Sequence, residues 1–130
     1  MKCENLKINP RFNDCDPMGH VNNAVFLSYT EEARIHFFKQ LLPENWNWKE
    51  NGIIIKKHEI IYFKQIYFDD IIEIKTEIKE IRNSSFKLNH KIIVENNIIS
   101  SIDSTLVYFN YYTNTSKSLD SLILNHIKNV

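Results

Sequence analysis

The sequence predicts a single α+β domain in which an antiparallel β-sheet of five or more strands wraps around one long helix. Apolar residues recur every three or four positions over residues 22–42, which is the period of an amphipathic helix. From residue 53 onward, isoleucine-rich segments alternate apolar with polar side chains, which is the period of strands that bury one face. Strands of this kind can bury a helix of about five turns by curling around it.

A first strand is predicted at residues 4–12 and the long helix at residues 22–42. Asn22 or Asn23 is suited to cap the helix, because an asparagine side chain accepts a hydrogen bond from a free backbone N–H in the first turn. Pro43 ends the helix, since proline cannot continue the backbone hydrogen bonding. The apolar residues at helical spacing, which predict an aromatic-rich buried face, are Phe26, Tyr29, Ala33, Phe37 and Leu41.

Four consecutive strands are predicted after a loop at residues 43–52. They span residues 53–63, 72–79, 86–94 and 98–112, and turn-forming residues separate them at 69–70, 83–84 and 95–97. His90 lies on the apolar face of its strand and is expected to be a hydrogen-bonded core histidine rather than a catalyst. The single domain covers residues 1–130, of which 113–130 form a polar linker and a short terminal helix containing Leu119, Leu122, Ile123 and Ile127.

Composition excludes several classes of partner. The 130 residues hold 16 basic and 16 acidic side chains, so the formal net charge is zero and no nucleic-acid partner is expected. No secretory signal and no apolar run long enough to span a bilayer is found, so no membrane partner is expected. Cys3 and Cys15 are expected to be free thiols in a reducing cytoplasm. The histidines lack metal-ligand spacing, and no metal site is expected.

The catalytic residues are expected in the turn before the helix, RFNDCDPMGHVNN at residues 11–23. Pro17 and Gly19 break regular structure, which places Asp16 in a loop facing the first helical turn. Free backbone N–H groups there, with the positive end of the helix dipole, can hold an oxyanion beside a carboxylate. A base or nucleophile next to such a site is the minimum needed for acyl transfer. The alternative is a plain turn, for which these residue types are common; Asp14 is expected to be structural.

At these residues the chain resembles the hotdog-fold acyl-CoA thioesterases of the 4-hydroxybenzoyl-CoA thioesterase type. The similarity covers DCDPMGHV at 14–21, FLSY at 26–29, EEAR at 31–34, FDDI at 68–71 and IRNSSF at 81–86, in the same order. The resemblance implies a hotdog fold, hydrolysis of an acyl-CoA thioester to a free carboxylic acid and CoA, and no cofactor. It also implies a homodimer or homotetramer whose active sites lie at the subunit interface.

The same resemblance implies three catalytic residues. Asp16 matches the aspartate that attacks the thioester carbonyl or activates the water that does. Asn23 matches the position at the helix start whose backbone N–H polarises that carbonyl. His20 matches a catalytic histidine of acyl-carrier-protein thioesterases of this fold, although Met18 stands where those enzymes carry asparagine. His20 is therefore a candidate acid or proton carrier, and the alternative is that it hydrogen-bonds the loop.

Substrate contacts are expected from Gly19, Asn22, Arg82 and Ser85. Arg82 matches a basic position that contacts the phosphates or the nucleotide of CoA. Three alternatives stay open: an acyl-carrier-protein thioesterase, a hotdog enoyl-CoA hydratase, and a non-catalytic acyl-binding protein of the same fold. For the hydratase, the spacing between aspartate, proline and histidine departs from the expected one, because Gly19 is inserted.

Overall fold

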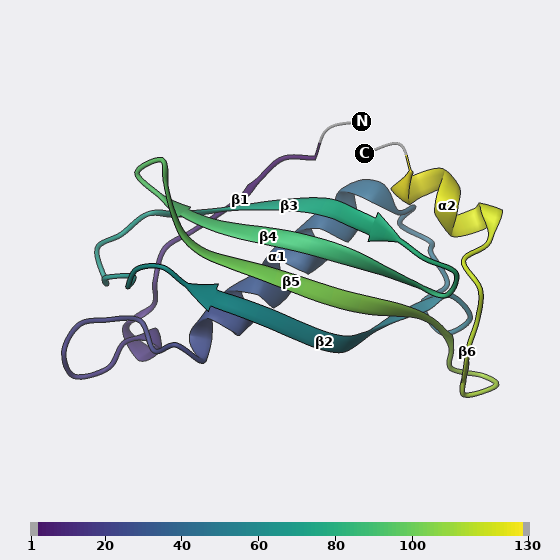
Figure 1. The fold of residues 1–130 in the computed structure, drawn as a ribbon, viewed down its shortest axis with the longest axis horizontal. Helices are drawn as coiled ribbons and strands as arrows, with labels where there is room; N and C mark the ends of the chain where they lie inside the picture. Colours follow the sequence, from purple (N-terminus) through teal and green to yellow (C-terminus); the bar gives the residue numbers. More distant parts are fainter. Residues whose placement is uncertain (1–2, 129–130) are drawn as a thin grey trace.

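The computed structural model describes residues 3–128, and in this part of the chain one long helix lies across one face of a six-stranded antiparallel sheet (Figure 1). The helices are α1 (Val25–Leu41) and α2 (Ser121–Ile127), with a short 3₁₀ helix at Phe12–Asp14. The strands are β1 (Leu6–Ile8), β2 (Gly52–Tyr62), β3 (Ile72–Ile81), β4 (Ser85–Val94), β5 (Asn97–Asn110) and β6 (Thr115–Ser116). Their order is β1-β3-β4-β5-β2, and β6 pairs with β5. The predicted α+β architecture is therefore confirmed.

Two predicted elements near the N-terminus are shorter than expected. The first strand ends at Ile8, because Phe12 already belongs to the 3₁₀ helix and the Arg11 backbone N–H donates to Asp14 Oδ2 at 2.8 Å. Helix α1 begins at Val25 rather than at residue 22, because the Asn22 side chain accepts from the Ala24 backbone N–H at 3.1 Å in a turn that precedes the helix. No side chain caps α1.

The core between α1 and the sheet consists of two apolar clusters with a polar layer between them. The first cluster contains Phe26, Tyr29, Ala33, Ile74, Ile92 and Ile102, and the second contains Phe37, Leu41, Phe86, Leu88, Leu106 and Tyr108. In β2, β3, β4 and β5 a polar residue lies between the two clusters. These residues are His58, Thr76, His90 and Ser104. Arg34 lies between the two clusters on α1. The register pairs Thr76 with His90 and His58 with Ser104, whereas His90 lies opposite Ile102.

His90 in this polar layer is buried as predicted, but only one of its ring nitrogens is satisfied. Nδ1 lies 2.8 Å from Thr76 Oγ1, while Nε2 has no hydrogen-bond partner within residues 3–128. The prediction of a hydrogen-bonded core histidine is therefore confirmed at Nδ1, and Nε2 is left unpaired. Burial lowers the pKa of His90 to about 3, and the positive charge of Arg34 acts in the same direction.

The predicted terminal helix is confirmed as α2, although Leu119 precedes it and Leu122 is half exposed. The last two residues of the predicted 113–130 segment lie outside the described part of the chain. Within residues 3–128 no helix combines the length and the apolar composition needed to cross a bilayer.

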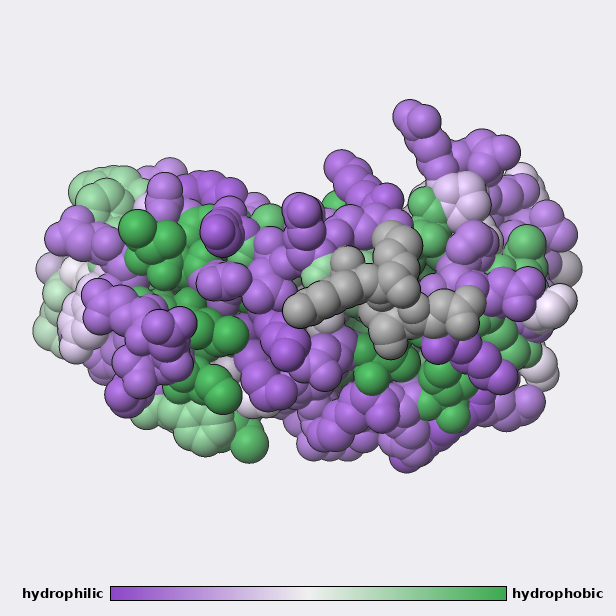
Figure 2. Space-filling model, turned by 90° about the horizontal axis from the view of Figure 1, so that it is seen from above, coloured by the Kyte–Doolittle hydropathy of each residue, from purple (hydrophilic) through white to green (hydrophobic). Residues whose placement is uncertain are grey.

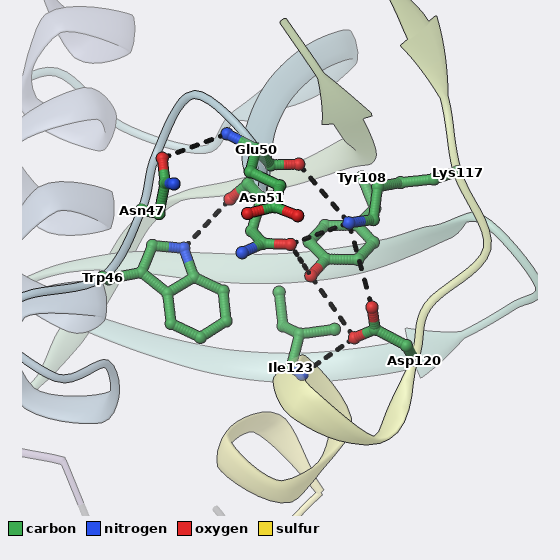
Figure 3. A network of polar contacts seen from close by, with 8 residues as sticks. All are labelled: Trp46, Asn47, Glu50, Asn51, Tyr108, Lys117, Asp120 and Ile123. Carbon is green, nitrogen blue, oxygen red and sulfur yellow. Dashed lines mark hydrogen bonds and ion pairs between the residues drawn. The ribbon is translucent and has the colours of Figure 1, made fainter. Parts of the chain in front are cut away.

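A polar network attaches α2 to the body of the protein (Figure 3). The Tyr108 hydroxyl donates to Asn51 Oδ1 at 2.8 Å, and Lys117 Nζ donates to the same oxygen at 2.7 Å. Asp120 Oδ1 caps α2 by accepting from the Ile123 backbone N–H at 3.2 Å, and it lies 3.3 Å from the Tyr108 hydroxyl. The network therefore joins the loop before β2, strand β5 and the start of α2.

Tyr108→Phe is expected to lower the free energy of unfolding by about 1–3 kcal/mol, because a buried hydroxyl bound to Asn51 and close to Asp120 is lost. Urea denaturation followed by circular dichroism measures this change. Tyr112→Phe is the matched control, since Tyr112 is 68% exposed. Equal stability of the two variants would show that the network does not stabilise the fold.

Candidate active site

The turn that contains Asp16 is closed by its own carboxylate. Asp16 Oδ1 accepts from the backbone N–H of Met18 at 2.9 Å and from that of His20 at 3.1 Å. The Asp16 N–H donates to the His20 carbonyl at 2.8 Å. Gly19 has φ +80°, a left-handed conformation that side chains rarely adopt, so glycine is required for this turn. The local sequence thus holds the Asp16 carboxylate in one position.

Asp16 lines an open groove of about 500 Å³ with mostly apolar walls. The lining residues are Phe12, Cys15, Asp16, Pro17, Gly19 and Phe68. The rings of Phe12 and Phe68 meet edge to face with centroids 6.5 Å apart, and Phe12 is 83% exposed. An apolar group can therefore lie beside the carboxylate. The face of the molecule shown in Figure 2 carries apolar patches toward both ends within a mostly hydrophilic surface.

The segment entering α1 offers one free backbone donor. Within residues 3–128 the Asn23 N–H makes no hydrogen bond, whereas the Ala24 N–H is bound by the Asn22 side chain at 3.1 Å. The Tyr62 hydroxyl donates to the Asn23 carbonyl at 3.1 Å and fixes this peptide against the end of β2. Asn22 and Asn23 are not among the residues lining the Asp16 groove. The single chain thus brings Asp16 and Gly19 together and leaves both asparagines outside that groove.

His20 lies in the same turn as Asp16 and is half-buried. It forms an antiparallel bridge with Tyr67, and the two rings pack edge to face with centroids 4.8 Å apart. Within residues 3–128 no hydrogen bond holds the imidazole. The ring is therefore positioned by packing alone.

The other groups of this turn have structural roles. Asp14 Oδ2 accepts from the buried Tyr29 hydroxyl at 2.7 Å, and burial followed by this carboxylate raises the pKa of Tyr29. Arg11 pairs with Glu32 of α1 at 2.7 Å and so ties the 3₁₀ helix to the long helix. The pKa of the Cys15 thiol is raised, first by loss of solvent and then by the two neighbouring aspartates, which disfavours a nucleophilic thiolate.

Arg82 and Ser85 lie together in a second groove of about 350 Å³ at the β3–β4 turn. Figure 1 places this turn at the end of the sheet opposite to the Asp16 turn. The Arg82 guanidinium binds Glu80 with two contacts, at 2.8 and 3.2 Å. Glu80 therefore competes with any phosphate for this cation.

Three lysines also line this second groove, and the sequence did not predict them as binding residues. Lys56 and Lys57 come from β2 and Lys87 from β4. The pairing register joins them across the sheet, because Lys57 lies opposite Thr105 and Thr105 lies opposite Lys87. One signal was present in the sequence: the adjacent lysines at 56–57 follow three consecutive isoleucines, and the structure has a register shift between Ile55 and Lys57. The groove is basic despite the zero net charge of the chain.

No cluster of three or more metal-ligating side chains forms among residues 3–128. The predicted site residues thus fall in three places. Asp16, His20 and Gly19 share one turn, Asn22 and Asn23 lie on the segment leading into α1, and Arg82 and Ser85 share a basic groove at the other end of the sheet.

Comparison with known proteins relates the chain to one family. The family model described as the Thioesterase-like superfamily matches residues 10–127. The acyl-CoA thioesterase YbgC of Helicobacter pylori is 36% identical over 73 residues, which are 55% of this chain and 53% of that protein. The acyl-CoA thioester hydrolase YbgC of Escherichia coli O157:H7 is 26% identical over 103 residues, 74% of each chain. The match spans about half the length of the Helicobacter relative.

Solved structures share the fold over nearly the whole chain. A thioesterase predicted in Bacillus stearothermophilus superposes with a TM-score of 0.87 at 24% identity and covers 97% of this chain and 94% of that one. A thioesterase from Thermus thermophilus, solved with coenzyme A and Zn, superposes with a TM-score of 0.86 at 28% identity over 96% of this chain and 91% of that one. The hotdog fold that the sequence resemblance implied is confirmed.

Proposed function

Because this chain belongs to the Thioesterase-like superfamily, we propose that it hydrolyses an acyl-CoA thioester to a carboxylic acid and CoA. The observation that carries the proposal is the Asp16 carboxylate, held by two backbone N–H groups on the wall of an apolar groove. Two YbgC relatives named for acyl-CoA thioesters support CoA as the carrier. The match covers about half of the Helicobacter protein, so the substrate of this chain is part of the proposal and is tested below.

The proposed chemistry uses Asp16 for the attack. In one route the carboxylate adds to the thioester carbonyl, expels the CoA thiolate and forms an anhydride that water then hydrolyses. In the other route Asp16 takes a proton from the attacking water, and the same thiolate leaves. Asn23 lies outside the Asp16 groove, so its free N–H would stabilise the oxyanion in both routes once the thioester carbonyl lies between the Asp16 turn and the start of α1. The thiolate is a good leaving group, so His20 has only a secondary task as acid or proton carrier.

Substrate binding is divided between the two ends of the sheet. Gly19 lets the acyl thioester approach the backbone of the Asp16 turn, and Asn22 orders the turn before α1. Arg82 and Ser85, together with Lys57 and Lys87, bind the phosphates or nucleotide of CoA in the basic groove. Arg82 becomes available when phosphate displaces Glu80, whose carboxylate is exposed.

We further propose that the protein is a homodimer, alone or paired into a homotetramer. β2 is the edge strand of the sheet and spans 11 residues, which suits it to pair with a second copy. Tyr62 at the end of β2 packs on Phe26 at the start of α1 with ring centroids 5.0 Å apart. Ile53 at the beginning of β2 shares a groove with Phe38 near the end of α1. Antiparallel pairing of two β2 edges would therefore set the α1 start of one copy beside the α1 end of the other.

The two cysteines support the cytoplasm as the proposed location. Cys3 and Cys15 are both free thiols in the structure. Free thiols on a partly exposed surface persist in a reducing compartment.

A panel of acyl-CoA thioesters with a thiol-detecting reagent tests the proposed activity. Thiol release is expected from at least one member, with no metal added. Release from acyl-carrier-protein thioesters alone would move the carrier from CoA to that protein. Hydration of an enoyl-CoA without thiol release would establish a lyase, and binding without turnover would establish an acyl-binding protein. Each of the last three outcomes overturns the proposal.

A further inference from the structure

A third groove, of about 740 Å³, runs along the C-terminal half of α1. It includes neither Asp16 nor the basic residues around Arg82. Its walls come from α1, the loop after it and the beginning of β2. Its apolar lining residues are Ile35, Phe38, Leu42, Pro43, Trp48 and Ile53. Ile35 is 49% exposed and Trp48 is 47% exposed, so two large apolar side chains face the open space. A hollow of this size and polarity suits the apolar body of a small ligand.

Arg34 adds a poorly compensated cation to this groove. Its side chain is 21% exposed, and the carboxylate paired with it within residues 3–128 belongs to Glu31, at 3.6 Å and 65% exposed. Burial lowers the pKa of Arg34, and Glu31 only partly offsets that effect. Lys39 and Glu44, both exposed, are the other charged residues of the lining. A half-buried guanidinium whose partner is in solvent favours an anionic ligand.

Within residues 3–128, the two histidines on the interior side of Arg34 do not compensate its charge. Burial lowers the pKa of both His58 and His90, and the charge of Arg34 acts in the same direction, so both imidazoles are neutral at pH 7. His58 Nδ1 is already bound to Ser104 Oγ at 2.8 Å. An anionic group bound in the groove would therefore add to the partial compensation that Glu31 provides.

In the proposed dimer this groove lies close to the catalytic turn of the second copy. Since α1 runs antiparallel to β2, two-fold pairing of the β2 edges would set the groove of one copy beside the Asp16 turn of the other. A thioester attacked at that turn would extend its acyl group into the groove.

We propose that this groove binds the acyl group of a thioester held at the Asp16 turn of a second copy, and that Arg34 selects acyl groups whose far end carries a carboxylate. The inference rests on the proposed function and adds the substrate class to it. Trp48, Ile35 and Phe38 contact the methylene or ring body, and the guanidinium binds the distal carboxylate with two hydrogen bonds.

The test compares adipoyl-CoA with hexanoyl-CoA, two thioesters of equal chain length that differ in the terminal carboxylate. The native protein is expected to hydrolyse adipoyl-CoA with a kcat/KM about tenfold higher or more. Arg34→Met is expected to remove this preference and to leave kcat/KM for hexanoyl-CoA within about a factor of three. Lys39→Met, which removes an exposed cation from the same groove, is the matched control and is expected to keep the preference. Arg34→Lys keeps the charge and is expected to retain part of it.

Two outcomes would overturn the inference while leaving the proposed function intact. One is hydrolysis of both thioesters with no preference by the native protein. The other is an equal loss for both substrates in Arg34→Met, which a purely structural role would produce; thermal unfolding of Arg34→Met and Arg34→Lys identifies that case. Failure of the proposed function is distinguishable, because no member of the thioester panel would then release thiol.

Discussion

Asp16→Asn is expected to reduce kcat for thioester hydrolysis by roughly 10²–10⁴-fold while leaving the fold and the oligomeric state unchanged. The turn survives because an asparagine Oδ1 can still accept from the Met18 and His20 N–H groups, at 2.9 and 3.1 Å in the native protein. What is lost is the negative charge, which serves as nucleophile or base in the proposed reaction. Steady-state kinetics with the best substrate of the panel, together with circular dichroism and size-exclusion chromatography, measure the three quantities.

Asp14→Asn is the matched control for the Asp16 variant. Asp14 accepts from the Tyr29 hydroxyl at 2.7 Å, so its loss of charge is expected to lower thermal stability with a smaller effect on kcat. His20→Ala, measured in parallel, is expected to lose less activity than Asp16→Asn. Full activity in Asp16→Asn would remove this residue from the chemistry, and an equal loss in His20→Ala would make His20 an equal partner.

His90→Leu is expected to make the protein markedly less sensitive to acid. The pKa of His90 is about 3 in the folded protein, against an ordinary value of 6.5. Between these values the unfolded chain binds a proton that the folded chain rejects. The contribution of His90 to the free energy of unfolding is therefore fully present above pH 6.5. It is lost as the pH falls toward 3, at about 1.4 kcal/mol per pH unit. His90→Leu has no imidazole at this position, so its free energy of unfolding is expected to fall less between pH 6.5 and pH 3.

The groups that face His90 determine how this experiment is controlled. Thr76 on β3 contacts the ring, and the charges of Arg34 on α1, His58 on β2 and Asp103 on β5 influence its pKa. Thr76→Val keeps the imidazole, so it is expected to lower stability by about 1 kcal/mol at every pH without changing the slope. Urea denaturation between pH 7 and pH 4 gives the slopes. Equal slopes for the native protein and His90→Leu would show that His90 does not govern acid stability.

Local patterns in the sequence were sufficient for most of the architecture. The isoleucine alternation predicted β3 and β4 within one or two residues, because side-chain period alone decides which face of a strand is buried. The spacing of aromatic residues predicted α1 for the same reason. Gly19 stands at a left-handed position, which few other residue types tolerate. The hotdog architecture and the Asp16 turn were thus accessible from sequence.

Long-range placement was accessible only in the tertiary structure. The start of α1 moved to Val25 because the Asn22 side chain bonds within the preceding turn instead of capping the helix. The basic groove around Arg82 gathers lysines from strands distant in sequence, and a zero net charge conceals it.

The sequence by itself determined the side-chain periodicity of the helix and strands, the residues of the Asp16 turn and the family motif. Each of these depends on neighbours along the chain. Only the tertiary structure decided that Arg34 lies half-buried between neutral histidines and an exposed glutamate, and that His90 keeps an unpaired nitrogen within residues 3–128. Burial and partner distance depend on how strands and helix pack, and residues far apart in sequence set both.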